Sequence, residues 1–332
     1  MKLQDEKTNQ LYNGDCLIEL DKVEDKSVQL VLIDPPYNIG KDDWDNFGIV
    51  KKGYRNHRES YSGESYLDFM EKAFIKLETK LKDNGSFFFF HNDFRIMSRL
   101  DLIVEDKTNL IQRNFLIWNK RFDGAKKKGF LDGFIVKGGL TRFNKMAEYM
   151  LFYTFDNSWK LRQKRLELNI NQSTIAKEIK SKTGKVTGWY SNLETGKNLP
   201  TRETIVPIEK HLGLTYDDIV PKFYNQKTHH SVWEYDLDHK KEGHITPKPI
   251  ELLKNIIEHT TDKGDIVLDC FMGSGSTGVA CNETNRKFIG IEKDKKYFDL
   301  SNKRISESLG IEKYMVQKKY HMLPIYENER DC

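Results

Sequence analysis

The sequence has few cysteines and no long hydrophobic run. Its four cysteines are Cys16, Cys270, Cys281 and Cys332. They form no Cys-x-x-Cys pair, which argues against a zinc ribbon and a disulfide scaffold. No apolar stretch approaches the roughly 20 residues that cross a bilayer, so we expect no membrane partner. The N-terminal residues are too polar for a signal peptide, and we expect a cytoplasmic protein.

The length and composition indicate a folded chain with room for more than one unit. With 332 residues, the chain can form a large α/β domain and a smaller one. Hydrophobic residues make up 38% and aromatic residues 12%, which excludes a disordered tail and favours a globular protein.

The positive charge is concentrated in one segment. Residues 160–222 hold twelve Lys and Arg against seven Asp and Glu, while the net charge of the whole chain is only +4. Such a basic stretch is typical of a nucleic-acid contact. A solvated helical surface is the alternative interpretation.

Short apolar runs alternate with helical patterns along most of the chain. Strands are predicted at 28–33, 86–90, 111–118, 147–155, 265–270 and 287–292, and helices at 65–81 and 277–283. This alternation predicts an α/β fold with a parallel, doubly wound sheet. Residues 156–240 break the rhythm, because they are helical and basic and then loop-like. We interpret them as an insert that divides one domain into 1–155 and 241–332.

A glycine-rich turn, DCFMGSGST, lies between a predicted strand and a predicted helix. Glycines allow a ligand to approach the backbone closely, and a helix N-terminus offers free N–H groups to an anion. Glu292 ends the next strand, where its carboxylate can accept hydrogen bonds from both hydroxyls of a ribose. The combination predicts a site for an adenosine-containing cofactor. A purely structural turn is the alternative.

The same turn lacks the residues of the common phosphate-binding motifs. It lacks the lysine of a P-loop and the third glycine of the dinucleotide fingerprint. A nucleoside without phosphates therefore fits better, which favours S-adenosylmethionine. We expect its carboxylate near Ser276 and Thr277 and its sulfonium at the ends of the strands.

The second motif, Asp34-Pro35-Pro36-Tyr37, directly follows the predicted strand 28–33. The exocyclic amine of adenine or cytosine is a poor nucleophile, and acceptors placed against its N–H bonds stabilise the charge that develops on attack. Asp34 and the Pro35 carbonyl can supply these acceptors, and the proline pair limits their movement. Tyr37 can stack on a base taken out of the duplex. A strand-ending turn with a packed tyrosine is the alternative.

The segments VLIDPPYNIG and LDCFMGSGST together resemble the beta group of DNA amino-methyltransferases, which methylate N6 of adenine or N4 of cytosine. Further elements resemble that family in the same order: 13–15, 81–86, 117–120, 148–153 and 244–249. The resemblance covers about 1–155 and 243–305. It implies a Rossmann-like sheet of the S-adenosylmethionine-dependent methyltransferases with a helical insert.

The resemblance also implies a set of site residues. Asp34, Pro35, Pro36 and Tyr37 are the catalytic residues that it implies. The cofactor contacts are Asp15, Asp34, Thr246, Lys248, Asp269, Phe271, Gly273, Ser274, Gly275, Ser276, Thr277 and Glu292. Three positions depart from the family pattern, because Cys270 replaces a proline, Ser276 a threonine and Ile245 a proline.

The implied reaction uses double-stranded DNA and no metal. An aspartate at the first catalytic position goes mainly with adenine, so Asp34 favours N6-adenine, with N4-cytosine as the alternative. An RNA or small-molecule methyltransferase on the same fold is a further hypothesis. A cognate restriction endonuclease is an expected partner. Dimers are common in the family, although no residue here establishes one.

Residues 161–200 resemble the helix-turn-helix of phage repressors, whose recognition helix ends in a Leu-Glu-x-Gly-Lys element. The resemblance implies that Gln172 contacts phosphate, that Thr187, Gly188 and Asn192 face the major groove, and that Lys197 closes the motif. We expect a target-recognition insert that holds the duplex against the catalytic face. The alternatives are a regulator that binds an operator, even a repressor with a vestigial enzyme domain, and an ordinary helical bundle.

Overall fold

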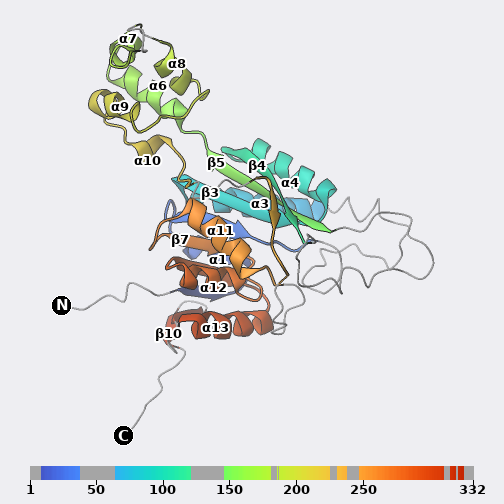
Figure 1. Ribbon diagram of the computed structural model, residues 1–332. Helices are drawn as coiled ribbons and strands as arrows, with labels where there is room; N and C mark the ends of the chain where they lie inside the picture. Colours follow the sequence, from blue (N-terminus) through green and yellow to red (C-terminus); the bar gives the residue numbers. More distant parts are fainter. Residues whose placement is uncertain are drawn as a thin grey trace, which may run out of the picture.

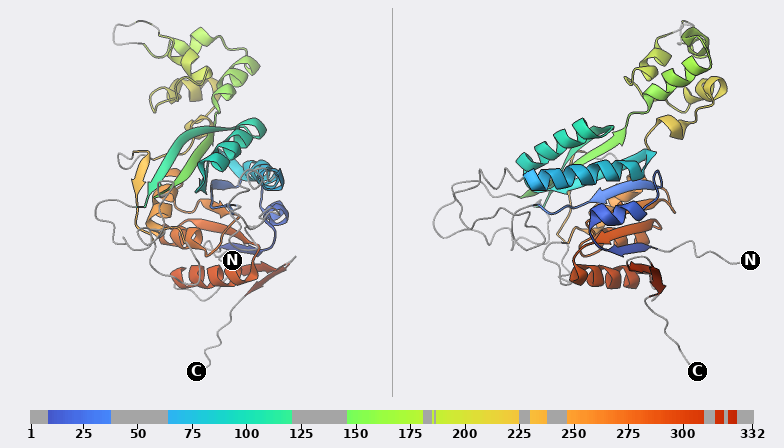
Figure 2. Two further views of the ribbon diagram at one scale, coloured as in Figure 1. Left: turned by 90° about the vertical axis from the view of Figure 1, so that its right-hand side faces the viewer. Right: turned by 180° about the vertical axis from the view of Figure 1, so that it is seen from behind.

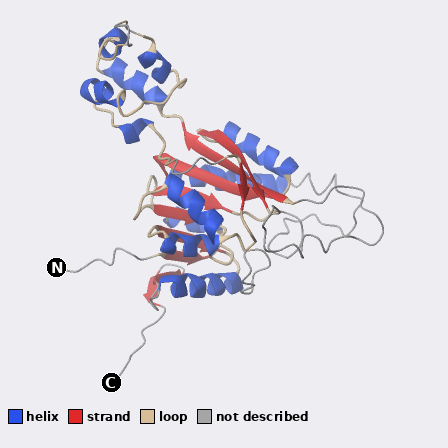
Figure 3. Cartoon of the chain, in the orientation of Figure 1, coloured by secondary structure: helices blue, strands red, loops and turns tan. Residues whose placement is uncertain are grey.

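The computed structural model describes residues 9–37, 64–120, 146–180, 185, 187–224, 230–237, 247–309, 315–318 and 321–324. These residues form one large sheet with helices on both faces and a separate group of helices at one end (Figure 1). The cartoon in Figure 3 separates the strand-rich body from this all-helical part. The predicted α/β fold is therefore confirmed.

The sheet has ten strands among the described residues, in the order β10-β9-β1-β8-β7-β2-β3-β5-β4-β6. The strands are β1 (Gln10–Asn13), β2 (Val28–Ile33), β3 (Leu81–His91), β4 (Leu110–Asn119), β5 (Ala147–Phe155), β6 (Val232–Glu234), β7 (Ile266–Asp269), β8 (Lys287–Glu292), β9 (Met315–Lys318) and β10 (His321–Pro324). The central strands are consecutive apolar runs, which is the composition of strands buried on both faces.

The sheet is parallel at its centre and mixed toward its edges. Strands β1, β8, β7, β2 and β3 are parallel neighbours, as predicted. Strand β5 instead pairs antiparallel with both β3 and β4. The helix α4 (Phe94–Lys107) carries the chain from β3 to β4 in the same direction, and this crossover leaves a position between them that β5 fills.

Helices cover both faces of the sheet (Figure 2). One face packs against α1 (Cys16–Glu19), the 3-10 turn η1 (Leu20–Lys22), α3 (Glu64–Lys80) and α4, and its core includes Met70, Phe74 and Leu100. The other face packs against α11 (Ile250–Thr260), α12 (Ser276–Glu283) and α13 (Lys295–Leu309). None of the described helices has the length and apolarity needed to span a membrane.

The helical insert has a hydrophobic core of its own. Its helices are α6 (Ser158–Glu167), α7 (Gln172–Ala176), α8 (Trp189–Glu194), α9 (Ile205–Leu212) and α10 (Tyr216–Ile219). Leu161, Ile175, Tyr190 and Ile208 are fully buried within this group. Because this cluster is separate from those of the sheet, the insert packs as its own unit.

Candidate active site

Polar side chains from neighbouring strands meet at one edge of the sheet. Asp34 follows β2, His91 ends β3, Asp269 ends β7 and Glu292 ends β8. Strand β7 lies between β2 and β8 and is parallel to both. The Asp34 motif and the glycine turn therefore lie on the same edge, where ligands of open α/β sheets bind.

The buried carboxylate of Asp269 stabilises the glycine-rich turn through two hydrogen bonds. Asp269 Oδ1 accepts a hydrogen bond from Phe271 N at 3.0 Å, and Oδ2 accepts one from Thr277 Oγ1 at 2.7 Å. Burial raises the pKa of Asp269 to about 7. The aspartate thereby ties the start of the turn to the first turn of α12.

The two glycines of the turn have different structural roles. Gly273 N donates to Glu292 Oε2 at 2.8 Å, which joins the turn to the end of β8. Gly275 has φ +80° and precedes α12. A Cβ on Gly275 would lie 2.8 Å from the Cβ of Ser301, so both conformation and space favour glycine here.

The remaining residues of the turn are mostly engaged within the protein. Ser274 and Ser276 are buried and their hydroxyls lie 3.4 Å apart. Arg304 donates to the carbonyl of Ser274 at 2.6 Å, which holds the turn against α13. Cys270, which replaces the usual proline, is buried, and this burial raises the pKa of its thiol well above the usual range.

The segment 13–15 packs beside Glu292. Gly14 N and Asn13 Nδ2 donate to the carbonyl of Glu292 at 3.0 and 2.9 Å. Asp15 caps α1 through Leu17 N at 3.0 Å and forms an ion pair with Lys293. The sequence element that we assigned to the cofactor site thus lies at the ends of β1 and β8.

Both carboxylate oxygens of Asp34 accept hydrogen bonds from other side chains of the site. The ammonium of Lys248 contacts Oδ2, and the hydroxyl of Tyr37 donates to Oδ1. Lys248 Nζ also donates to the Tyr37 hydroxyl at 3.1 Å. Burial, and then the charge of Asp34, raise the pKa of Tyr37 well above its usual range. The tyrosine is therefore a neutral donor.

The loop that carries Asp34 is braced from two other elements. Tyr66 of α3 donates its hydroxyl to the Pro36 carbonyl at 2.8 Å. The ring of Tyr37 lies against that of His91, with centroids 4.7 Å apart. Pro35 is buried. The loop 34–37 is therefore in contact with both α3 and the end of β3.

Lys248 and Glu148 are the buried centre of a row of alternating charges whose ends, Asp34 and Lys120, are partly exposed. On the side away from Asp34, the ammonium of Lys248 lies 3.2 Å from Glu148 Oε2 of β5, and Lys120, just after β4, contacts the other oxygen of Glu148. Although burial opposes ionisation, Lys248 and Lys120 lower the pKa of Glu148 to about 2. The row therefore runs minus, plus, minus, plus from Asp34 to Lys120.

Our sequence analysis did not assign Glu148 or Lys120 to the site. The available signal was an acid inside a strand whose other residues are mainly apolar, because a buried carboxylate needs a paired cation. Lys248 was predicted to contact the cofactor, and the structure places its ammonium on Asp34. Thr246 lies outside the described residues.

The four residues predicted to bind DNA lie on or beside α7 and α8 and do not join this site. Gln172 Nε2 donates to Glu194 Oε2 at 3.0 Å. Thr187 and Lys197 are exposed, and Asn192 is half-buried. Across the described ranges, no group of three or more His, Cys, Asp or Glu is arranged to hold a metal ion.

Comparison with known proteins gives relatives of similar length. The chain is 28% identical to the Type II methyltransferase M1.MboII of Moraxella bovis, over 89% of this chain and 95% of that protein. It is 27% identical to the DNA adenine methyltransferase YhdJ of Escherichia coli K12, over 89% of this chain and 82% of that protein.

Solved structures share the fold. The putative DNA modification methylase TTHA0409 of Thermus thermophilus, crystallised with S-adenosyl-L-methionine, gives a TM-score of 0.54 at 18% identity, over 94% of this chain and all of that one. The PvuII DNA methyltransferase, named as cytosine-N4-specific, gives 0.53 at 14% identity, over 92% of each chain.

The family profile covers both motifs of the site. The N6_N4_Mtase profile, described as DNA methylase, matches residues 28–303, which include Asp34, the glycine turn and the helical insert between them. The chain belongs to this family of DNA methylases.

Proposed function

We propose that this DNA methylase transfers the methyl group of S-adenosylmethionine to the N6 amine of adenine in duplex DNA. The observation that carries the proposal is the shared edge at which Asp34 lies beside the glycine turn and Glu292. An aspartate at position 34 and the similarity to a protein named as a DNA adenine methyltransferase support adenine. N4 of cytosine is the second candidate, because the PvuII enzyme with the same fold is named for it.

The residues present fit a nucleoside cofactor that carries a positive charge. Each oxygen of Glu292 accepts one backbone N–H, from Gly273 and from Asp294, and keeps a lone pair for a ribose hydroxyl. Acidic groups line the turn, and the segment 269–277 contains no lysine or arginine that would pair with a phosphate. When bound, S-adenosylmethionine supplies a methyl group on a positively charged sulfur.

Asp34 is the group that we assign to the target amine. The two carboxylate oxygens of Asp34 accept hydrogen bonds from Lys248 and Tyr37. The target amine can therefore bind Asp34 only after it displaces one of these two donors. Tyr37 is the donor that leaves, because its ring then turns to stack on the extruded base. Lys248 stays in contact with the other oxygen of the carboxylate. Asp34, with the Pro35 carbonyl, then stabilises the positive charge that develops on the amine.

The test is methylation of plasmid DNA by the purified protein, followed by mass spectrometry of the nucleosides. N6-methyladenine is expected, whereas N4-methylcytosine would establish the second candidate. Asp34→Ala should lower the rate by at least about 100-fold and leave S-adenosylmethionine affinity, measured by equilibrium dialysis, within about threefold. Full activity of this variant, or a preference for RNA over duplex DNA, would contradict the proposal.

The segment 156–240, predicted as an insert, includes β6, which pairs with β4 in the sheet, so only its helical part packs as a separate unit. We also propose that residues 1–155 and 241–332, together with β6, form one catalytic domain, and that the helical part of the insert binds duplex DNA through a helix-turn-helix made by α7 and α8. The exposed Thr187 and Lys197 support this assignment. A promoter shift without any methyl transfer would instead favour a transcriptional regulator.

The relatives named as Type II methyltransferases support a further proposal, that the chain protects DNA from a cognate restriction endonuclease. Sequencing of methylated bases in cells that express the protein should show modification at one recognition sequence. DNA from these cells should then resist an endonuclease specific for that sequence. Modification scattered over unrelated sequences would contradict this pairing.

A further inference from the structure

The insert is joined to the sheet at the start of β3. Where the chain enters it, Asn157 Nδ2 donates to the Asp83 carbonyl at 2.7 Å, and Lys160 forms an ion pair with the Asp83 carboxylate at 2.6 Å. Where the chain leaves it, Lys222 N donates to the Asn84 carbonyl at 3.0 Å. Both connections therefore contact two adjacent residues near the amino end of this strand.

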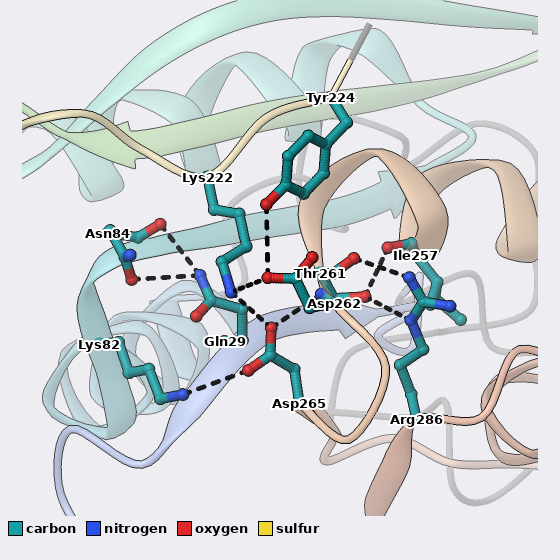
Figure 4. A network of polar contacts seen from close by, with 10 residues as sticks. All are labelled: Gln29, Lys82, Asn84, Lys222, Tyr224, Ile257, Thr261, Asp262, Asp265 and Arg286. Carbon is teal, nitrogen blue, oxygen red and sulfur yellow. Dashed lines mark hydrogen bonds and ion pairs between the residues drawn. The ribbon is translucent and has the colours of Figure 1, made fainter. Parts of the chain in front are cut away.

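A sheltered polar network fixes this junction (Figure 4). Lys222 Nζ pairs with Asp262 at 2.7 Å and with Asp265 at 2.8 Å, and Lys82 reaches Asp265 from β3. The side chains of Lys222 and Asp265 are each only 13% exposed, so salt screens this pair less than a surface pair. Asp265 directly precedes β7, which anchors the insert to a second strand of the sheet.

The junction and the catalytic loop lie at opposite ends of β3. Asn84 is near its start, and His91, whose ring lies against Tyr37, is its last residue. A strand rises about 3.3 Å per residue, so these seven steps separate the two by about 23 Å. From this junction the helices α6–α10 extend further outward, away from the sheet (Figures 1 and 2).

This arrangement limits which DNA the insert can hold. A duplex that presents a base to Asp34 has to lie across the carboxyl ends of the strands. Duplex DNA is stiff, with a persistence length of about 50 nm, so it does not fold back around one sheet to reach the opposite end. The segment that contains the target base therefore stays out of reach of α7 and α8.

The insert nevertheless carries features of a DNA-binding surface. Lys177 directly follows α7, Lys197 lies just beyond α8, and both are exposed, as is Thr187 before α8. Five other basic residues of the insert form ion pairs within the protein, namely Lys160, Lys164, Arg165, Lys210 and Lys222, whereas Arg162 and Lys180 are also exposed. The lysines at the ends of α7 and α8 are therefore well placed to contact phosphate.

We infer that the insert binds a second segment of duplex DNA, distinct from the segment that holds the target base. The inference rests on the proposed DNA binding by the insert and assigns it a separate ligand. One protein molecule then holds two duplex segments at opposite ends of the sheet.

The experiment tests whether the full-length protein connects two duplexes. A biotinylated duplex of about 16 base pairs, carrying the mapped methylation site, is fixed to beads. Protein is added, and then labelled duplexes of random sequence, about 60 base pairs long, which are retained only if the protein binds both. The wild-type protein and the Asp34→Ala variant should both retain the labelled DNA, because capture requires no methyl transfer.

The variant that separates the two sites is Lys177→Glu with Lys180→Glu, two exposed residues that follow α7 and are not among the four residues predicted to bind the target duplex. We expect at least about tenfold less capture and a shallower salt dependence, while KM and kcat on the short duplex match the wild type. The matched control, Lys263→Glu with Lys303→Glu, makes the same charge change on exposed residues of the α/β part and should capture normally. Circular dichroism verifies that all variants fold.

Three results would overturn the inference. The wild-type protein could capture no second duplex, or the insert variant could capture as much as the wild type, as a dimer with two target sites would. The variant could also raise KM for the short duplex about tenfold, which would place the insert on the target. If the mapped product is N4-methylcytosine and the protein still captures the second duplex, the proposed N6-adenine function is overturned and this inference stands.

Discussion

At the scale of single residues, the arrangement of the site depends on charged side chains that are shielded from solvent. Lys248 lies between two carboxylates, and Lys120 closes the row on Glu148. A buried ion has a large desolvation cost that only a close partner offsets. We therefore assign Glu148 as a positioning residue, because it contacts Lys248, which in turn contacts Asp34.

Glu148→Gln tests this role. The substitution leaves two neighbouring lysines without their shared acid, so we expect the free energy of unfolding to fall by about 3–5 kcal/mol, measured in urea. We also expect kcat to fall at least about tenfold with a smaller change in KM.

A double substitution tests the same row in a different way. Adding Lys120→Met to Glu148→Gln removes the cation that lost its partner acid. The double variant should therefore recover part of the lost free energy of unfolding. Lys120→Arg keeps the charge and should stay near the wild type. Losses that simply add in the double variant would show that the two residues do not act as a pair.

Asp269 makes stability depend on pH. Its pKa is about 7 in the folded protein against a usual value of 3.8, so the folded state keeps a proton that the unfolded state has released. Stability from this residue is therefore present at low pH and is lost as the pH rises from about 4 to about 7.

The substitution Asp269→Asn removes this titration. Relative to the wild type, the variant should gain roughly 1.4 kcal/mol of unfolding free energy per pH unit across that window. Urea unfolding of both proteins at several pH values measures the difference. A gap between the two curves that stays constant with pH would show that Asp269 does not titrate there.

Motif spacing was enough to predict the residues that meet in the site from neighbouring parallel strands. Asp34, Gly273 and Glu292 each follow or end a recognisable apolar run, so their common edge could be predicted. The inward hydrogen bond of Tyr37 and the pairing of Glu148 could not, because both depend on side chains brought together from distant segments.

At the scale of elements, the turn before α12 is the most constrained. Gly275→Ala introduces strain at φ +80° and also a Cβ 2.8 Å from Ser301. We expect a loss of about 1–3 kcal/mol in stability and at least about tenfold in S-adenosylmethionine affinity.

Gly264→Ala is the matched control for that substitution. Gly264 has a similar φ of +86°, but nothing lies within 4 Å of an added Cβ. It should lose about 1 kcal/mol from backbone strain alone and keep its affinity for S-adenosylmethionine. Equal effects of the two substitutions in thermal melting and equilibrium dialysis would exclude the contact with Ser301 as a cause.

Three strands were predicted with the correct bounds, whereas β3, β4 and β7 were predicted with different bounds. Strands β2, β5 and β8 match their predicted residues. Strand β1 has only four residues and no long apolar run, so local pattern did not reveal it. The direction of β5 could not be predicted from the sequence either, because an apolar run can pair with a parallel or an antiparallel neighbour equally well.

At the scale of the whole molecule, the insert was predicted from a change in rhythm and charge. Its orientation could not be predicted, since it depends on ion pairs between residues far apart in the chain, such as Lys160 with Asp83 and Lys222 with Asp265. No local pattern encodes such pairs.

Lys160→Met with Lys222→Met should loosen the insert without unfolding it. The helices keep their own core, whereas the connections lose their anchors, so cleavage by a protease near 156–158 and 220–224 should become several-fold faster. Lys164→Met is the control, because its exposed pair with Glu167 lies within α6 and contributes little. Unchanged cleavage in the double variant would mean that other contacts hold the junction.

The contacts of Asn157 and Lys222 with Asp83 and Asn84 also make the insert replaceable. Its two ends leave the sheet side by side, so a few glycines and serines would bridge them after residues 158–221 are removed. Such a shortened enzyme would keep every described strand of the sheet, and other binding modules whose ends lie equally close could be transplanted at the same place.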